Sequence, residues 1–364
     1  MTVSMRVMSA GDGYKYLLKT VVAADGDRPL STPLTRYYME DGTPPGRWLG
    51  AGVAALGKGE IQVGDRVSEH QLQLLMGTGC DPITGDKLGL GFAAYKSQEQ
   101  RIEARIADLE PTMTPGAKGE AVAQIVAEET ARSTRRAVAG FDFTFSIPKS
   151  ASVLWAVADA GVQALIAEAH HRAVAEVVAF MEREVAATRT GATAGDGAVA
   201  QVDVTGLIAT AFDHFDSRAG DPHLHTHVVI SNKAKTVLDG KWRSLDGRPM
   251  HTAVVALSEL HEAVFADHMT RTFGVSWEAR EMGRDHNPAW AITGVPDELI
   301  AEFSTRARHI NAETDRLIAK YVAAHGRRPT PAAIMKLRAQ ATLATRPEKQ
   351  VRSLADLTVE WRER

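Results

Sequence analysis

Residues 212–230 read FDHFDSRAGDPHLHTHVVI and decide the fold, because they place two apolar segments on either side of a short polar turn. Residues 199–212 and 224–230 both have the composition of β-strands. A connection this short joins neighbouring strands in antiparallel order. The segment therefore predicts a hairpin within an antiparallel sheet.

A further strand is predicted at residues 141–147, FDFTFSI, where apolar and polar side chains alternate strictly. One face of this strand is apolar and buried, and the other is polar. Pro148 ends the strand, and either Ser150 or Ser152 is expected to cap the helix that follows.

The rest of the chain reads mainly as helices, and the glycine-rich residues 46–58 predict a tight turn or a close backbone approach. An antiparallel sheet backed by helices makes the class α+β. Helical patterns cover residues 97–138 with a break, then a segment to about residue 187, and then residues 252–273, 296–324 and 331–343. The last residues, DLTVEWRER, resemble an unfinished helix, so we expect the natural chain to continue.

Composition narrows the function classes. The chain has 364 residues, 44% hydrophobic and 24% charged, which is ordinary for a globular protein of one large domain or two domains. Its single cysteine, Cys80, excludes an internal disulfide. The sequence has no apolar run of about 18 residues and no basic-then-apolar leader. We therefore expect a cytoplasmic protein without membrane insertion.

The charges of the chain are segregated. The net charge of −3 argues against a protein that coats nucleic acid through bulk charge. Between Lys320 and Arg352, however, eight basic residues accompany one acidic residue, Glu348. This run is either a solvated helical face or part of a localised groove for a nucleic-acid backbone.

Four of the thirteen histidines fall within residues 212–230. On a strand, residues two apart share a face, so His225 and His227 stand side by side. The turn returns the chain so that His214 comes beside them, whereas His223 is expected in the loop. Three neutral imidazoles in this arrangement make a metal site with open positions for a substrate oxygen. The alternative is that these histidines are structural.

Three motifs in this order resemble the MobF-type conjugative relaxases of the HUH endonuclease superfamily. They are N-terminal tyrosines followed by GRWLGAG, then FDFTFSIPKS, and then LHTHVVI with a histidine eleven positions before its first histidine. The resemblance implies a two-layer sandwich with a central five-stranded antiparallel sheet, flanked by helices, and a helical C-terminal lid. It also implies nicking and rejoining of one DNA strand at a transfer origin, through a 5′-phosphotyrosine adduct and a divalent metal ion (Mg, Mn or another first-row metal).

The resemblance also assigns residues. His214, His225 and His227 match the metal triad, and Asp142 matches an aspartate that orients a triad histidine or accepts the tyrosine proton. The nucleophile is expected among the early tyrosines: Tyr14 fits best by its place after Ser-Ala-Gly, Tyr37 is next, and Tyr16 remains a candidate.

Further residues have expected roles under the same resemblance. Lys149 and Arg189 are predicted to contact DNA phosphates, and Trp48 either packs in the core or stacks on a base. Residues 1–290 are expected to form the relaxase domain. Residues 291–364 are expected to form the lid and the start of a linker to a helicase region. Single-stranded DNA, relaxosome accessory proteins and a type IV coupling protein are the implied partners.

Two other function classes remain open from the residues. A metal-dependent phosphoesterase would use water as its nucleophile and would need neither tyrosine nor DNA groove. A non-catalytic origin-binding protein would carry the histidines as structural residues. The two classes differ from a relaxase in forming no covalent protein–DNA adduct.

Overall fold

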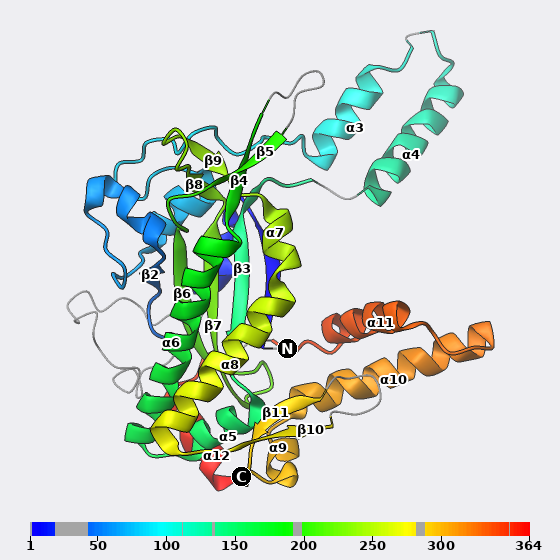
Figure 1. Cartoon of the computed structure of the whole chain (residues 1–364). Helices are drawn as coiled ribbons and strands as arrows, with labels where there is room; N and C mark the ends of the chain where they lie inside the picture. Colours follow the sequence, from blue (N-terminus) through cyan, green and yellow to red (C-terminus); the bar gives the residue numbers. More distant parts are fainter. Residues whose placement is uncertain are drawn as a thin grey trace.

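A five-stranded antiparallel sheet lies at the centre of the molecule (Figure 1). The computed structural model describes residues 2–18, 43–110, 112–132, 135–191, 199–281, 288–348 and 350–364. The strand order is β1–β3–β7–β6–β2, with all neighbours antiparallel. Their bounds are β1 Val3–Ser9, β2 Arg47–Leu49, β3 Val138–Ser146, β6 Ala209–Asp216 and β7 Pro222–Ser231. The predicted α+β class and five-stranded antiparallel sheet are confirmed.

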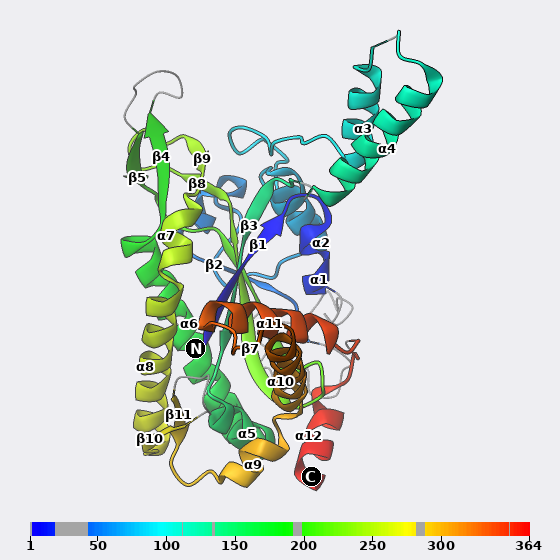
Figure 2. The ribbon, with the colours of Figure 1, turned by 90° about the vertical axis from the view of Figure 1, so that its right-hand side faces the viewer.

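Two long helices, α6 (Ala160–Glu184) and α8 (Val254–Phe273), cover one face of the sheet (Figure 2). The predicted alternation in β3 explains this layer, because Phe143 and Phe145 are fully buried in the core beside helix residues such as Val177. The same alternation turns Asp142 and Thr144 to the other face. The chemistry-bearing side chains of β3 are thus separated from its apolar ones.

Short helices from the N-terminal part of the chain pack on the opposite face of the sheet. They are η1 Asp12–Tyr14, α1 Lys15–Leu18, η3 Ala51–Ala55, η4 Gly57–Gly59, α2 Glu69–Leu72 and η5 Gln73–Thr78. The predicted close approach occurs at Gly50, which has φ +96° and where a Cβ would lie 2.3 Å from the carbonyl oxygen of Leu207. Trp48 is fully buried here, so it packs in the core.

A further core cluster lies at the end of the sheet where α5 (Lys149–Val157) and α12 (Leu354–Glu363) meet. It includes α9 (Asp297–Glu302) and the hairpin of β10 (Trp277–Arg280) and β11 (Ala289–Ile292). The predicted serine cap of α5 is wrong: Pro148 occupies the cap position without a side-chain hydrogen bond. The hydroxyl of Ser150 instead accepts a hydrogen bond from the backbone nitrogen of Ile292.

The remaining elements extend from this body (Figure 1). They are the helical pairs α3 Gln98–Ala107 with α4 Pro115–Ala131 and α10 Thr305–His325 with α11 Pro331–Ala344, the strand pairs β4 Ala187–Gly191 with β5 Val199–Asp203 and β8 Lys233–Lys235 with β9 Trp242–Ser244, and the short helix α7 Gly247–Thr252.

Two predicted elements are each divided in the structure. The strand expected over residues 199–212 is interrupted at residues 204–208, giving β5 and β6. The helix expected over residues 296–324 is interrupted at Phe303 and Ser304, giving α9 and α10. In the described part of the chain, no helix combines the length and apolar character needed to cross a membrane.

Candidate metal centre and tyrosine site

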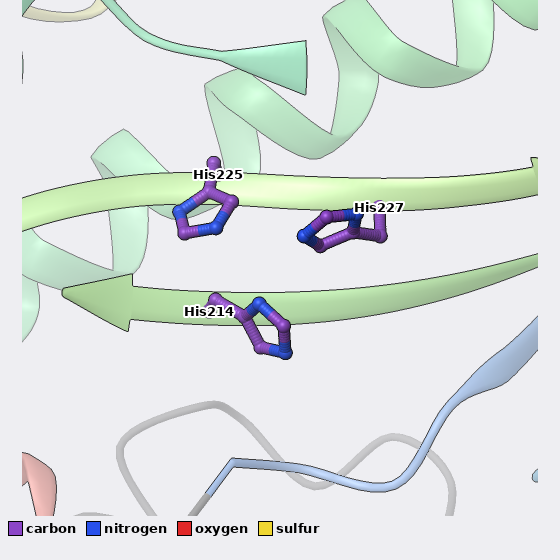
Figure 3. A group of neighbouring side chains, drawn as sticks. All are labelled: His214, His225 and His227. Atoms are coloured by element: carbon purple, nitrogen blue, oxygen red, sulfur yellow. The ribbon is translucent and has the colours of Figure 1, made fainter. Parts of the chain in front are cut away.

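Three histidines converge on the face of the sheet opposite α6 and α8. His225 and His227 lie on β7, and His214 lies on β6 directly opposite His225 in the strand register. Figure 3 shows the two rings from β7 facing the ring from β6. One ligand atom from each side chain lies within 4.8 Å of the others. The sequence prediction that these three histidines come together is consistent with this geometry.

Hydrogen bonds orient two of these imidazoles. Nδ1 of His227 lies 2.9 Å and 3.0 Å from the two carboxylate oxygens of Asp142, and donates to them. Nδ1 of His225 donates to the carbonyl oxygen of His223 at 2.6 Å. Because Nδ1 carries the proton in both rings, the Nε2 lone pair is the one available to a metal ion.

The electrostatics of the cluster favour neutral imidazoles. Burial lowers the pKa of His225 well below the usual histidine value, and the neighbouring His223, His214 and His227 lower it further. Three closely spaced neutral nitrogen donors suit a first-row divalent ion, with positions left open for substrate oxygens. The donor set therefore fits the divalent metal ion expected from the sequence.

Tyr16 completes the site. Its hydroxyl donates a hydrogen bond to Oδ2 of Asp142, the carboxylate that also accepts from His227. The ring of Tyr16 meets that of His227 edge to face, with the centroids 6.1 Å apart. Burial, and then the charge of Asp142, raise the pKa of Tyr16 above its ordinary value. Asp142 thus links a tyrosine hydroxyl directly to the histidine cluster.

The other early tyrosines are placed differently. Tyr14 is only 2% exposed and packs in the core with Leu17 and Trp48, and burial raises its pKa. Tyr14 ends η1 and Tyr16 lies in α1, and residues two apart on a helical turn point about 200° apart. The helical turn thus directs Tyr16, rather than the expected Tyr14, toward Asp142. Tyr37 lies outside the described residues.

His223 lies at the start of β7, and Lys149, the first residue of α5, reaches the same end of that strand. His223 belongs to the strand, so its expected placement in the loop is wrong, and its ring centroid lies 4.5 Å from that of His225. Lys149 donates from Nζ to the carbonyl oxygen of Pro222 at 2.7 Å, and burial lowers its pKa to about 8. These contacts make Lys149 part of the support of β7 beside the histidines.

Arg189, the other predicted DNA-binding residue, lies on β4. Its Nε is 3.4 Å from Oδ2 of Asp246, and half of its side chain is exposed. Figure 1 shows β4 and β5 at the end of the molecule opposite α12. Arg189 is therefore on a separate element from the histidine cluster, and it is accessible to solvent.

A cavity of about 660 Å³ lies between the β6–β7 turn and the C-terminal helices. Its lining includes Asp216 from the end of β6 and the basic residues Arg218 and Arg346. Burial lowers the pKa of Arg218, and repulsion from Arg346, Arg306 and Arg6 lowers it further. In the part of the chain that the structure describes, none of these four arginines forms an ion pair with a carboxylate side chain. Arg346 belongs to the basic run between Lys320 and Arg352, for which a nucleic-acid groove was one of two predictions, whereas Arg218, Arg306 and Arg6 are too far away along the chain for the sequence to connect them with it.

Comparison with known proteins adds independent information. Residues 10–364 match the family described as TrwC relaxase. Two curated relatives are both called multifunctional conjugation protein TraI. One, from Escherichia coli, is 30% identical over 196 residues, and the other, from Escherichia coli strain K12, is 28% identical over 194 residues. Each alignment covers 51% of this chain and 10% of the relative, so the chain spans about a tenth of their length.

Solved structures share the fold. The conjugative relaxase TrwC in complex with oriT DNA, in a metal-bound structure, has a TM-score of 0.61 and 23% identity, and the match covers 99% of this chain and 96% of that chain. The metal-free structure of TrwC with oriT DNA has a TM-score of 0.60 and 22% identity over the same shares. The two-layer architecture around the histidine cluster is thus that of a known fold.

Proposed function

Because the chain belongs to the TrwC relaxase family, as its motifs implied, we propose that it nicks and rejoins one DNA strand at the transfer origin of a plasmid or conjugative element. The observation that carries this proposal is the contiguous set of Tyr16, Asp142 and His227, which joins a nucleophile, a proton acceptor and the histidine cluster. The similar structure of TrwC, which is metal-bound and in complex with oriT DNA, supports the choice of substrate and cofactor.

Asp142 and Tyr16 have complementary roles in the proposed reaction. A phenol is a weak nucleophile at neutral pH, so its proton must be removed as it attacks. The carboxylate of Asp142 already accepts the hydrogen bond from Tyr16 and is placed to take that proton. The Tyr16 oxygen then forms a bond to phosphorus while the bond from phosphorus to the 3′ oxygen breaks. The 3′ oxygen takes up a proton from solvent and leaves as a hydroxyl.

His214, His225 and His227 would hold a divalent metal ion beside this reaction. When bound, the ion supplies Lewis-acid stabilisation of the charge on the non-bridging phosphate oxygens. Asp142 keeps the Nδ1–H of His227 oriented, which directs Nε2 toward the centre of the triad. The identity of the metal is open among Mg, Mn and other first-row ions.

The same residues account for rejoining. The adduct between Tyr16 and the 5′ phosphate is a phosphodiester, so the bond energy of the cleaved strand is retained. A 3′ hydroxyl that returns to the site can therefore lose its proton to solvent, form a bond to phosphorus and break the bond from phosphorus to the tyrosine oxygen, without an external energy source. Asp142 then returns the proton to the tyrosine oxygen.

The cavity lined by Arg218 and Arg346 is the proposed path of the single strand. Arg218 and Arg346 repel each other, and phosphates, which bind arginine through paired hydrogen bonds, relieve this repulsion. We propose that residues 1–290 form the nicking unit and that residues 291–364 close over the strand as a lid. Lys149 of α5 supports the start of β7 through its hydrogen bond to Pro222, and Arg189 on β4 is available for a second DNA contact.

Wider features of the proposal follow from the family. Accessory relaxosome proteins and a type IV coupling protein are the proposed partners, and the cytoplasm is the proposed location.

The direct test uses single-stranded DNA from the cognate transfer origin, Mn²⁺ and a denaturing gel that retains covalent adducts. We expect the wild-type protein to form an adduct, Tyr16→Phe to form none, and Tyr14→Phe to retain activity within about threefold of wild type, because Tyr14 packs in the core. Tyr37→Phe tests the tyrosine outside the described residues. His225→Ala should abolish nicking and leave oligonucleotide binding within about tenfold, because phosphate contacts supply most of the affinity.

Other outcomes identify the other functions. Cleavage that survives in Tyr16→Phe, Tyr14→Phe and Tyr37→Phe alike, without an adduct, indicates a metal-dependent phosphoesterase that uses water. Binding that is indifferent to chelation, with neither cleavage nor adduct, indicates an origin-binding protein with structural histidines.

A further inference from the structure

A chain of buried polar side chains lies directly behind the metal triad, on the other face of the sheet. Thr226 stands between His225 and His227 on β7, and Asp213 precedes His214 on β6. The two are register partners, and Oγ1 of Thr226 donates to Oδ1 of Asp213 at 2.5 Å. Thr226 is fully buried and Asp213 almost fully. A side-chain hydrogen bond therefore joins the two strands at the level of the triad.

Side chains from two helices extend this series of buried hydrogen bonds. His170 of α6 lies with Nε2 2.9 Å from Oγ1 of Thr226, and its Nδ1 is 3.3 Å from Nε2 of His261 on α8. Nδ1 of His261 lies 3.2 Å from the hydroxyl of Thr2. His170, His261 and Thr226 are all fully buried. Neither the predicted function nor the metal site uses these groups.

The direction of the hydrogen bonds follows from the chemistry of Asp213. The carboxylate of Asp213 pairs with the guanidinium of Arg47, whose Nη1 lies 2.5 Å from Oδ2, and Nε2 of His171 lies 3.1 Å from Oδ1. A carboxylate only accepts, so Thr226 gives its single proton to Asp213 and must accept from Nε2 of His170. Nδ1 of His170 is then bare and accepts from Nε2 of His261.

The hydrogen bond between Thr226 and Asp213 lies at a point along β6 and β7 where it can restrain His214. The β6–β7 register shifts between His214 and Asp216, so the regular ladder ends immediately beyond His214. Pairing resumes at Asp216 and Pro222, so His214 lies directly beside the irregularity in the β6–β7 ladder. The Thr226–Asp213 bond provides a constraint at the adjacent pair, on the face that is packed against α6.

We propose that Thr226 and Asp213, held by His170 and His261, are positioning residues that fix His214 against His225 and His227 for metal binding. This inference rests on the proposed metal triad. Groups that hydrogen-bond to metal ligands fix the orientation of those ligands; Thr226 and Asp213 act on the neighbouring histidines through the backbone of β7 and β6. The buried chain therefore controls metal affinity without contacting the metal or the DNA.

The test measures Co²⁺ binding to the untagged full chain, by calorimetry and by the visible spectrum of the bound ion. Thr226→Val keeps the side-chain shape and removes the hydroxyl, and we expect Co²⁺ affinity to fall about tenfold, with a changed spectrum, as for other supporting groups. Thr226→Ser restores the hydroxyl and should restore both affinity and spectrum.

Thr210→Val is the matched control. Thr210 is also fully buried on β6, but its hydroxyl has no hydrogen-bond partner among the described residues. Its affinity for Co²⁺ should stay within about twofold of wild type, since no orienting group is removed. Wild-type affinity in a folded Thr226→Val protein, or equal losses in Thr226→Val and Thr210→Val, would overturn the proposal.

A second pair of variants decides the question if Thr226→Val does not fold. In His170→Gln, the side-chain amide nitrogen reaches the position of Nε2 and still donates to Thr226. In His170→Asn, the side chain is shorter, and its amide nitrogen does not reach that position. We expect Co²⁺ affinity to be retained in the glutamine variant and to fall about tenfold in the asparagine variant. Equal affinities in the two variants contradict the proposal.

The wild-type titration separates this inference from the proposed function. If wild-type protein binds no Co²⁺, and His225→Ala behaves identically, the metal triad itself is wrong. If wild-type protein binds Co²⁺ and His225→Ala does not, the triad stands, and the Thr226 variants alone decide the role of the buried chain.

Discussion

Asp142 accepts hydrogen bonds from two groups of different chemistry, the imidazole of His227 and the hydroxyl of Tyr16. Both hydrogen bonds require the carboxylate, because each of its two oxygens accepts hydrogen bonds and donates none. Asp142→Asn replaces one oxygen by an NH₂ group, which presents hydrogens to one of these donors. We expect Co²⁺ affinity to fall about tenfold, and nicking to fall by about a hundredfold or more, because the proton acceptor is also lost.

The control for Asp142→Asn is Thr144→Val on the same strand. The hydroxyl of Thr144 is 3.3 Å from Nδ1 of His227, a marginal hydrogen bond beside the two shorter ones to Asp142. Its loss should change metal affinity by less than about threefold, since the orienting carboxylate remains. An Asp142→Asn protein that nicks at the wild-type rate would show that another group takes the proton of the nucleophile.

His261 links the buried chain to acid stability. Burial lowers its pKa to about 4, against an ordinary value of 6.5. Between these values the unfolded chain binds a proton that the folded chain does not, so the contribution of His261 is complete above pH 6.5 and declines as the pH falls toward 4. The limiting slope is about 1.4 kcal/mol per pH unit. His261→Gln should flatten this part of the curve.

Urea unfolding at several pH values between 4.5 and 7.5 measures the effect of His261. The difference in unfolding free energy between wild type and His261→Gln should shrink as the pH is lowered. Two parallel curves would mean that His261 binds its proton at the same pH in the folded and unfolded chain, which would contradict a lowered pKa of His261 in the folded protein.

At the residue scale, strand alternation was sufficient to predict the triad and to place Asp142 on the same face. It did not identify the tyrosine beside Asp142, because the choice between Tyr14 and Tyr16 depends on a short helical turn without apolar periodicity. The same alternation put Asp213 and Thr226 together on the opposite face, which was a signal for the buried chain. Their partners on α6 and α8 required the tertiary packing.

At the scale of elements, α12 fastens the turn between the two histidine strands. Trp361 is 1% exposed, donates from Nε1 to the carbonyl oxygen of Gly220 at 2.7 Å, and packs on Trp155 of α5. Trp361→Ala removes a large buried ring and a hydrogen bond to the turn. We expect the free energy of unfolding to fall by about 3–5 kcal/mol.

Val359→Ala provides the control on the same helix, because Val359 is 54% exposed. Its effect on chemical denaturation should stay within about 0.5 kcal/mol. Equal stability of Trp361→Ala and Val359→Ala would show that α12 does not anchor the turn, and that the C-terminal helices are independent of the histidine strands.

Element boundaries were the weaker part of the sequence prediction, and the reasons are local. The predicted strand over residues 199–212 is interrupted around Gly206, whose backbone lies so close to Gly52 that a Cβ would be 2.4 Å from the Gly52 nitrogen. The contact joins segments about 150 residues apart, so the local pattern carries no trace of it. The strand predicted over residues 224–230 lies within β7, whereas only residues 209–212 of the strand predicted over 199–212 belong to β6, which continues to Asp216.

At the scale of the whole molecule, the unpaired arginines predict how DNA binding depends on salt. For single-stranded DNA, each phosphate contact contributes about −0.7 to the slope of log affinity against log salt concentration. Arg218→Ala and Arg346→Ala should each reduce the slope of log affinity against log salt by about 0.7, because each removes one proposed contact. Arg271→Ala is the control: its side chain is 77% exposed and paired with Asp267 on α8, which lies on the other face of the sheet. Unchanged slopes in both cavity variants would place the strand elsewhere.

The two faces of the sheet carry different parts of the proposed site. One face of the sheet presents the triad, Asp142 and Tyr16, and the other face buries the chain that holds the triad strands in place. The C-terminal helices close the end of the sheet at the turn between those strands. This division follows from one property of β-strands, which is that successive side chains point to opposite faces.

The central claim is that Tyr16 attacks the phosphate beside the triad, and mapping the covalent adduct tests it most directly. Protein trapped with cognate single-stranded DNA and Mn²⁺ is digested with nuclease and protease, and the modified peptide is sequenced by mass spectrometry. We expect a nucleotide attached to Tyr16. A nucleotide on Tyr14 or Tyr37, with Tyr16 unmodified, would contradict it.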